Sequence, residues 1–253
     1  MPVRMPFDRV AGIYDKTRAV PPRLMGRLLS LLFDELRGKR VLEVGVGTGR
    51  FAVPLQKSGV EIVGVDISPK MVELGLAKGL RDVAYADAAR LPFAPRSFDV
   101  ATTNHMLHLI PDWREALLEI ARVTRESYFT ILERTDSKFN LQREYHEIVR
   151  AGGYDWKAPG LHERDLPDLV TPDVVMPVGP IHEVTPAESI LAELERRDYS
   201  SQWEVPEALH REAMEALRSR WSGKEIARDL STEIHFWRVD RLADLARKGP
   251  HPS

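Results

Sequence analysis

This chain of 253 residues contains no cysteine and no long hydrophobic run. Without cysteine there can be no disulfide framework, no cysteine-ligated metal and no thiolate nucleophile. No stretch approaches the roughly 20 apolar residues of a membrane-spanning helix. The N-terminal residues also lack the apolar region of a secretory signal. These absences predict a soluble, cytoplasmic protein without a membrane span.

Neither positive nor negative charge is in large excess, because the formal net charge is -2. A general nucleic-acid-binding surface is therefore disfavoured, although a local basic patch stays open. Hydrophobic residues make up 43% of the chain, an ordinary share for a globular protein. There is no internal repeat and no low-complexity tract.

Three glycines in alternate positions follow a short strand-like segment and a carboxylate. The run is Glu43-Val44-Gly45-Val46-Gly47-Thr48-Gly49. Residues without a Cβ let the backbone turn sharply and approach a ligand closely. The dinucleotide fingerprint is G-x-G-x-x-G, and here the third glycine comes one residue early. A carboxylate beside a pyrophosphate would also be repelled, so Glu43 suits a ligand that carries a cationic amine.

Two further carboxylates each follow a strand-like segment. Residues 61 to 65 are apolar and lead to Asp66, where a carboxylate can accept hydrogen bonds from both ribose hydroxyls. Residues 83 to 86 lead to Asp87, which can accept from an exocyclic amine such as that of adenine. Together with the glycine loop, these positions predict a nucleoside-containing cofactor.

The hydrophobic pattern alternates between strands and helices over the first half of the chain. We expect helices at 24–36, 49–57, 69–78 and 112–123, and strands at 40–44, 61–65, 82–86, 98–103 and 127–133. This alternation predicts an α/β fold with a parallel, doubly wound sheet covered by helices on both faces. Ligands bind such sheets beyond the carboxyl ends of the strands, where the glycine loop, Asp66, Asp87 and the pair Asn104-His105 all fall.

The pattern changes after residue 135. We expect a helix at 138–150, a long loop rich in Pro and Gly at 153–180, a helix at 186–197 behind a capping box at 185–188, another helix after Pro206, and a strand at 232–239. The whole chain 1–253 is predicted to be one domain. Its parts are a cofactor-binding core at 1–135, a variable helical substrate cap over the site at 136–230 and a final sheet strand at 231–239.

In its motifs and their order, the chain resembles the class I S-adenosylmethionine-dependent methyltransferases (methyltransferase type 11 domain). The small-molecule branch with the ubiquinone and menaquinone methyltransferases is the most similar. The matching residues are the glycine loop at 43–49, Asp66, Asp87-Ala88, Leu91-Pro92-Phe93, Ser97-Phe98-Asp99-Val100, Leu107-His108, Arg122-Val123 and an N-terminal segment at 7–15.

The resemblance implies a Rossmann-like, seven-stranded and mostly parallel sheet with an antiparallel last strand. It also implies S-adenosylmethionine (SAM) as cofactor, with S-adenosylhomocysteine as product.

Two departures from the family pattern stand out. Thr124-Arg125-Glu126-Ser127 replaces the usual Leu-x-Pro-Gly-Gly before the fifth strand, which shortens a turn. Residues 136–230 carry no family motif, and substrate choice in the family usually resides in such segments.

The Asn-Pro-Pro-Tyr signature of many enzymes that methylate nucleic-acid bases is missing, since Thr103-Asn104-His105-Met106 stands in its place. A small-molecule acceptor is favoured.

Spacing and resemblance together give the expected cofactor contacts. They are Tyr14, Arg18, Glu43, Gly45, Val46, Gly47, Gly49, Asp66, Ile67, Met71, Asp87, Ala88, Asn104 and His105. Met71 could instead be ordinary core, and Tyr14 could pack on the surface. His105, just past the fourth strand, is also the expected substrate-facing base. His105 and His108 form H-x-x-H, but no third ligand accompanies them and we expect no metal.

The expected mechanism is in-line displacement of the sulfonium methyl group, in which the protein mainly aligns donor and acceptor. A base is needed only if the acceptor is a hydroxyl, an amine or an acidic carbon. We expect methyl transfer to a small-molecule acceptor by a monomer or homodimer. Two alternatives stay open: a tRNA or rRNA methyltransferase of the same fold, with a basic stripe of cap arginines, and a non-catalytic SAM-binding protein.

Overall fold

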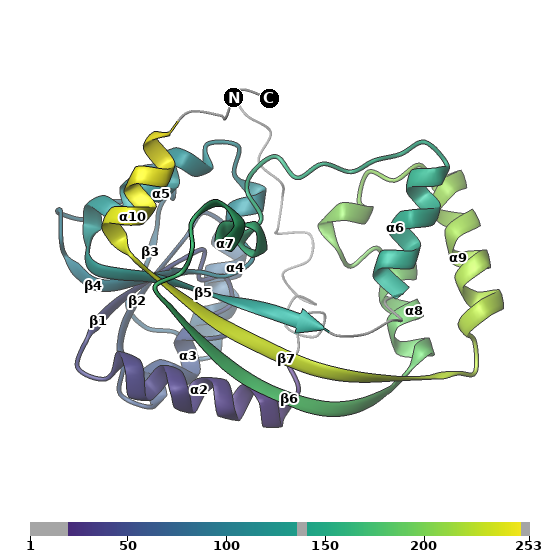
Figure 1. The fold of residues 1–253 in the computed structure, drawn as a ribbon, viewed down its shortest axis with the longest axis horizontal. Coiled ribbons are helices and arrows are strands. Elements are labelled where there is room, and N and C mark those ends of the chain that lie inside the picture. Colours follow the sequence, from purple (N-terminus) through teal and green to yellow (C-terminus); the bar gives the residue numbers. More distant parts are fainter. Residues whose placement is uncertain (1–19, 136–140, 249–253) are drawn as a thin grey trace.

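A computed structural model describes residues 20–135 and 141–248 (Figure 1). Its strands are β1 Arg40–Val44, β2 Glu61–Asp66, β3 Val83–Tyr85, β4 Phe98–Thr103, β5 Thr124–Thr135, β6 Val174–Pro186 and β7 Glu225–Arg238. Its α-helices are α2 Pro22–Leu36, α3 Ala52–Lys57, α4 Pro69–Ala77, α5 Trp113–Val123, α6 Leu141–Ala151, α7 Leu166–Leu169, α8 Ala187–Glu195, α9 Glu207–Trp221 and α10 Val239–Arg247. The expected contacts Tyr14 and Arg18, and the start of the expected helix at 138–150, lie outside the described residues.

The strands form one sheet in the order β3-β2-β1-β4-β5-β7-β6. The pairs β1–β2, β1–β4, β2–β3 and β4–β5 are parallel, whereas β7 is antiparallel to both β5 and β6. The predicted Rossmann-like, seven-stranded, mostly parallel sheet with an antiparallel last strand is confirmed. Because β1, β2 and β4 run in the same direction, the segments that follow them meet at one edge of the sheet.

Helices cover both faces of the sheet, as the alternating pattern predicts. One core cluster joins α2 and α3 to the sheet through residues such as Leu28, Leu32 and Leu55. The opposite cluster joins α5 and α10 through Leu117, Ile120 and Leu242. All six of these side chains are essentially removed from water. Their burial fixes the sheet as a rigid support for the loops at its carboxyl edge.

The C-terminal half contains a long strand where we expected a loop. Residues 153–180 are rich in Pro and Gly, yet β6 begins at Val174 and pairs with β7 up to Pro186, with a register shift between Val178 and Ile181. β6 lies at the edge of the sheet, where proline is tolerated because the N–H groups on the outer side need no partner. β7 likewise begins at Glu225, earlier than the expected strand at 232–239.

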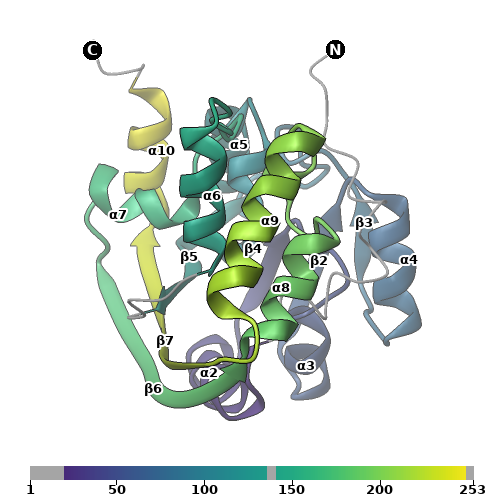
Figure 2. The same cartoon turned by 90° about the vertical axis from the view of Figure 1, so that its right-hand side faces the viewer.

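Three helices from the C-terminal half form a separate group. α6, α8 and α9 lie at the right of Figure 1, and the β6–β7 ribbon runs from the sheet to them. Figure 2 turns this group toward the viewer. The helices enclose their own apolar cluster, which includes Tyr145, Leu191, Leu217 and, from β7, Ile226.

Some local expectations were wrong. The capping box at 185–188 does not form, because Thr185 belongs to β6 and α8 begins after Pro186 without a side-chain cap. Glu188 instead accepts hydrogen bonds from Ser222 Oγ at 3.0 Å and Gly223 N at 2.8 Å. α5 ends at Val123 and β5 begins at once, so residues 124–127 are strand and not a shortened turn.

Candidate functional site

The glycine loop makes a tight turn at the carboxyl end of β1. Gly45, Gly47 and Gly49 have φ values of 75°, 54° and 75°, in the left-handed region that favours glycine. Gly45 N donates to Val65 O at 2.8 Å, which ties the start of the loop to β2. A Cβ added at Gly45 would lie 2.5 Å from Met106 Cγ, and one added at Gly47 would lie 3.1 Å from Met71 Cε. The loop therefore needs glycine both for its conformation and for space.

Asp66 ends β2 beside this loop. Its Oδ2 accepts a hydrogen bond from Gly47 N at 2.8 Å, and its Oδ1 accepts from Ser68 N at 2.8 Å. Ser68 in turn caps α4, since its Oγ accepts from Met71 N at 3.2 Å and Pro69 is the first helical residue. The carboxylate thus holds both the glycine loop and the first turn of α4.

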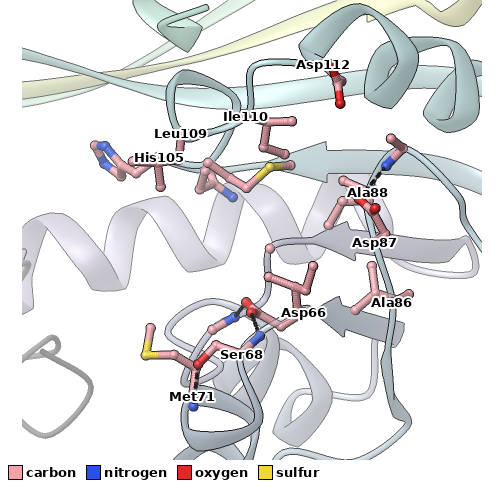
Figure 3. Close-up of a pocket in the computed structure, with 18 of the residues that line it drawn as sticks. Asp66, Ser68, Met71, Ala86, Asp87, Ala88, His105, Leu109, Ile110 and Asp112 are labelled. Atoms are coloured by element: carbon pink, nitrogen blue, oxygen red, sulfur yellow. Dashed lines mark hydrogen bonds between the residues drawn. The ribbon is translucent and has the colours of Figure 1, made fainter. Parts of the chain in front are cut away.

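A cavity of about 150 Å³ lies over this carboxyl edge of the sheet (Figure 3). Asp66, Ser68 and Met71 form one side of it, His105, Leu109, Ile110 and Asp112 lie across from them, and Ala86 to Ala88 close a third side. Asp87 Oδ1 accepts from Ala89 N at 3.1 Å, which orders that third side.

Most of the predicted cofactor contacts come together in this cavity. Gly45, Gly47, Asp66, Ile67, Met71, Asp87, Ala88, Asn104 and His105 all line it. Val46 and Gly49 do not: Val46 is buried against Gly64 in the core, and Gly49 faces Val53 and Leu80. Gly45 and Gly47 face the cavity whereas Val46 and Gly49 face the core, so only part of the loop can contact a ligand there.

Sequence reasoning missed several lining residues. They are Val44, Val65, Ser68, Ala86, Ala89, Met106 and the run Leu109 to Asp112. Val44, Val65 and Ala86 adjoin predicted contacts, so their places along the strands could have signalled them. Residues 109–112 follow the short 3₁₀ helix η2 Leu107–Leu109, and nothing in their local sequence indicates that this segment folds back over the cavity.

Glu43 lies directly behind the glycine loop and does not line the cavity itself. Its side chain is buried, and its Oε2 has no hydrogen-bond partner among the described residues. Burial raises the pKa of Glu43 to about 8, although a hydrogen bond with Asn104 and the charge of Arg50 act in the opposite direction. Such a carboxyl is mostly protonated at neutral pH and would ionise beside a cation.

A second, larger cavity of about 750 Å³ adjoins the first, and His105 lines both. Its walls come from the end of β5, from α6 and from the segment 154–164. Polar side chains dominate the lining, including His105, His108, Glu133, Gln142, Arg143, His146, Glu147, Arg150, Asp155, His162, Glu163, Arg164, Ser200 and Ser201, with Tyr154 and Trp156 among the aromatic ones. Burial lowers the pKa of His146 and of His162, which favours the neutral form of both imidazoles.

His105 sits in a strained position between the two cavities. Its φ of 56° is in the left-handed region, which is uncommon for residues other than glycine and is frequent at functional sites. Its Nε2 lies 3.6 Å from Glu133 Oε1. The imidazole is therefore near a carboxylate that can orient it.

No group of three or more metal-ligating side chains occurs within residues 20–135 and 141–248. Over the same residues, no helix is both long and apolar enough to cross a bilayer. The two histidines of the H-x-x-H pair lie near different carboxylates. His108 Nδ1 is 3.6 Å from Glu163 Oε2, whereas His105 approaches Glu133.

Comparison with known proteins agrees with the sequence motifs. Residues 42–131 match the methyltransferase domain family. The demethylmenaquinone methyltransferase of Renibacterium salmoninarum is 36% identical over 124 residues, which are 47% of this chain and 52% of that protein. The enzyme of the same name from Mycolicibacterium paratuberculosis is 38% identical over 123 residues, 47% of this chain and 53% of that protein. The match thus spans about half the length of these relatives.

Solved structures show the same fold. A candidate type II methyltransferase from Anaeromyxobacter dehalogenans aligns over 87% of this chain and 99% of its own, with a TM-score of 0.58 and 22% identity. A SAM-dependent methyltransferase from Thermotoga maritima aligns over 91% of this chain and 97% of its own, with a TM-score of 0.51 and 21% identity. The resemblance to class I SAM-dependent methyltransferases and the Rossmann-like methyltransferase fold are both confirmed.

Proposed function

We propose that this protein binds SAM in the smaller cavity and transfers its methyl group to a small molecule held in the larger one. The observation that carries the proposal is the convergence of the glycine loop, Asp66 and Asp87 on one cavity at the carboxyl edge of the sheet. Asp66 would accept from the ribose hydroxyls, and Asp87 with Ala88 would hold the adenine. Met71 would pack against the base or ribose.

The site fits the cationic amino acid end of SAM. Gly45 and Gly47 leave space where side chains would otherwise stand, and Glu43 behind them has a buried oxygen without a partner among the described residues. An ammonium group near Glu43 would satisfy that oxygen and stabilise its ionised form. When bound, SAM supplies an electrophilic sulfonium methyl, and the remaining work of the protein is alignment.

His105 is the proposed contact between donor and acceptor. It lines both cavities, so a group that emerges from the smaller cavity meets the acceptor beside this imidazole. If the acceptor loses a proton, the Nε2 of His105 can take it, and the nearby Glu133 would stabilise the resulting imidazolium. α6, α8 and α9, with the segment 154–164, act as the cap that limits access to the acceptor.

The lining of the larger cavity supports a polar acceptor. Two of the relatives are named for demethylmenaquinone, whose long isoprenoid tail calls for an apolar channel. Here ionisable and hydrogen-bonding side chains form most of the wall, and only a few residues such as Ile131 and Leu132 are aliphatic. A compact, water-soluble molecule satisfies these groups better than a prenylated quinone.

Two measurements test the proposal. Titration calorimetry with SAM should show saturable binding, and a lack of binding at millimolar SAM would contradict it. SAM labelled in its methyl group should then transfer label to a cell extract that has been separated into aqueous metabolites, lipids, RNA and protein. We expect label in the aqueous metabolites. Label in the lipids would support a prenylated acceptor, label in RNA would support the tRNA or rRNA alternative, and SAM binding without any transfer would support a non-catalytic role.

A further inference from the structure

A buried carboxylate from the C-terminal half reaches the wall between the two cavities. Glu163 lies in the short 3₁₀ helix η3 Glu163–Asp165, which matches no family motif, and only 6% of its surface is exposed. Its Oε1 accepts hydrogen bonds from Met106 N at 2.6 Å and from Leu107 N at 2.8 Å. Thr103 Oγ1 lies 3.4 Å from the same oxygen. One oxygen thus receives two backbone N–H groups of the segment that follows β4.

The surroundings keep Glu163 ionised. Burial alone would raise its pKa, but the neighbouring His108 imidazole and the N–H of Leu107 outweigh burial and lower the pKa to about 2. His108 is itself stacked on His162, with the ring centroids 4.9 Å apart. A charged acceptor makes stronger hydrogen bonds to the two N–H groups than a neutral one would.

The segment held by Glu163 touches the cofactor side as well. His105, which precedes the two donors, has a φ of 56° and lines both cavities. Met106 packs so closely on Gly45 that a Cβ there would lie 2.5 Å from Met106 Cγ. A continuous set of contacts therefore runs from Glu163 through the backbone of Met106 to the glycine loop.

Gly160 makes a second contact with the segment that follows β4. Its N–H donates to His108 O at 3.0 Å, and a Cβ at this position would collide with the carbonyl oxygens of Leu107 and Ile110. The chain at 160–163 thus lies directly on η2, with glycine at the point of closest approach. Glu163 and Gly160 therefore make two independent contacts with the segment after β4, which separates the acceptor cavity from the cofactor cavity.

We propose that Glu163 is a positioning residue: it holds the segment 105–107 in place and thereby couples the acceptor cavity to the cofactor cavity. The proposal rests on the proposed binding of SAM in the smaller cavity. Glu163 acts through the backbone of Met106 and Leu107 and through His105, without touching the cofactor. Replacement of Glu163 should therefore weaken SAM binding, although Glu163 lines the acceptor cavity and not the cofactor cavity.

Four variants test this role by calorimetry with SAM, thermal unfolding and amide nuclear magnetic resonance. Glu163→Ala removes both hydrogen bonds, and we expect SAM affinity to fall about tenfold or more. Glu163→Gln keeps a neutral acceptor of the same shape and should rescue part of this loss. Gly160→Ala should displace the segment while it leaves the carboxylate intact, with a loss similar to that of Glu163→Ala. Glu195→Gln is the control, because Glu195 pairs on the surface with Arg218 at 3.1 Å and lines neither cavity.

Amide signals distinguish positioning from a purely structural effect. In both Glu163 variants, the signals of Met106 and Leu107 should shift, and the signal of Gly45 should shift with them. If Glu163→Gln and Gly160→Ala fold and bind SAM with wild-type affinity, the proposal is wrong, even if thermal stability is lowered. If Glu163→Ala does not fold, these two variants decide the question. Failure of the wild-type protein to bind SAM would instead contradict the proposed function.

Discussion

The carboxylate of Asp66 accepts a hydrogen bond from the backbone N–H of Gly47 at 2.8 Å and so joins the end of β2 to the glycine loop. The residue proposed to hold the ribose therefore also orders the loop that faces the rest of the cofactor. Ligand contact and loop geometry depend on the same side chain, which makes the site sensitive to any change of this residue.

Asp66→Ala should weaken SAM binding about tenfold to a hundredfold, because hydrogen bonds to a charged group contribute roughly 1.5 to 3 kcal/mol. Asp66→Asn keeps one acceptor oxygen and should lose less. Calorimetry with SAM measures both. Equal affinity of Asp66→Ala and the wild type would show that Asp66 does not hold the ribose.

Glu43 should make SAM binding dependent on pH. Its pKa of about 8 leaves the carboxyl mostly protonated at pH 7, whereas a cationic amine binds the ionised form, so binding must release a proton. Affinity should rise between pH 6 and pH 7.5, by up to about tenfold per pH unit, and should stop rising near pH 8, where the α-amino group of SAM begins to lose its own proton.

Calorimetry in phosphate and in Tris detects this proton, because the two buffers differ in their enthalpy of protonation. Glu43→Gln, which cannot ionise, serves as the control and should abolish the difference between buffers. A binding enthalpy that is the same in both buffers for the wild type would refute the assignment of Glu43 to the amine end.

Gly45→Ala should destabilise the folded protein by about 2 to 4 kcal/mol, because a left-handed alanine and an overpacked contact with Met106 each cost on the order of 1 to 2 kcal/mol or more. Gly26→Ala is the matched control. Gly26 lies in α2 with nothing within 4 Å of an added Cβ, so alanine there should stabilise the protein by roughly 0.5 to 1 kcal/mol. Urea denaturation measures both changes, and a neutral Gly45→Ala would show that the loop can relax.

His105→Asn should reduce methyl transfer at least about a hundredfold, the lower end of what a general base contributes, and should lower SAM affinity much less. Asparagine tolerates the left-handed backbone that His105 adopts, so the wall between the cavities should keep its shape. Transfer of labelled methyl into the active extract fraction, measured beside SAM affinity, separates the two effects. Undiminished transfer would indicate an acceptor that needs no base.

Much of the lining of the smaller cavity could be predicted because its determinants are local. Gly45, Gly47, Asp66, Asp87 and Asn104 each follow an apolar strand-like run, and parallel strands bring such positions to one edge. Side-chain direction within the loop could not be predicted in the same way. Val46 was expected at the cofactor but packs on Gly64, because the tight turn directs its side chain into the core.

The sequence by itself determined the α/β order, the carboxyl-edge cluster and the resemblance to SAM-dependent methyltransferases, because spacing along the chain specifies which residues end which strand. Tertiary structure decided that the Pro-containing residues 174–186 form an edge strand, since an edge leaves one side of the backbone free of partners. It also decided that Glu163 holds Met106, 57 residues away. Such a contact depends on how the C-terminal half folds back on the sheet, and no local pattern records it.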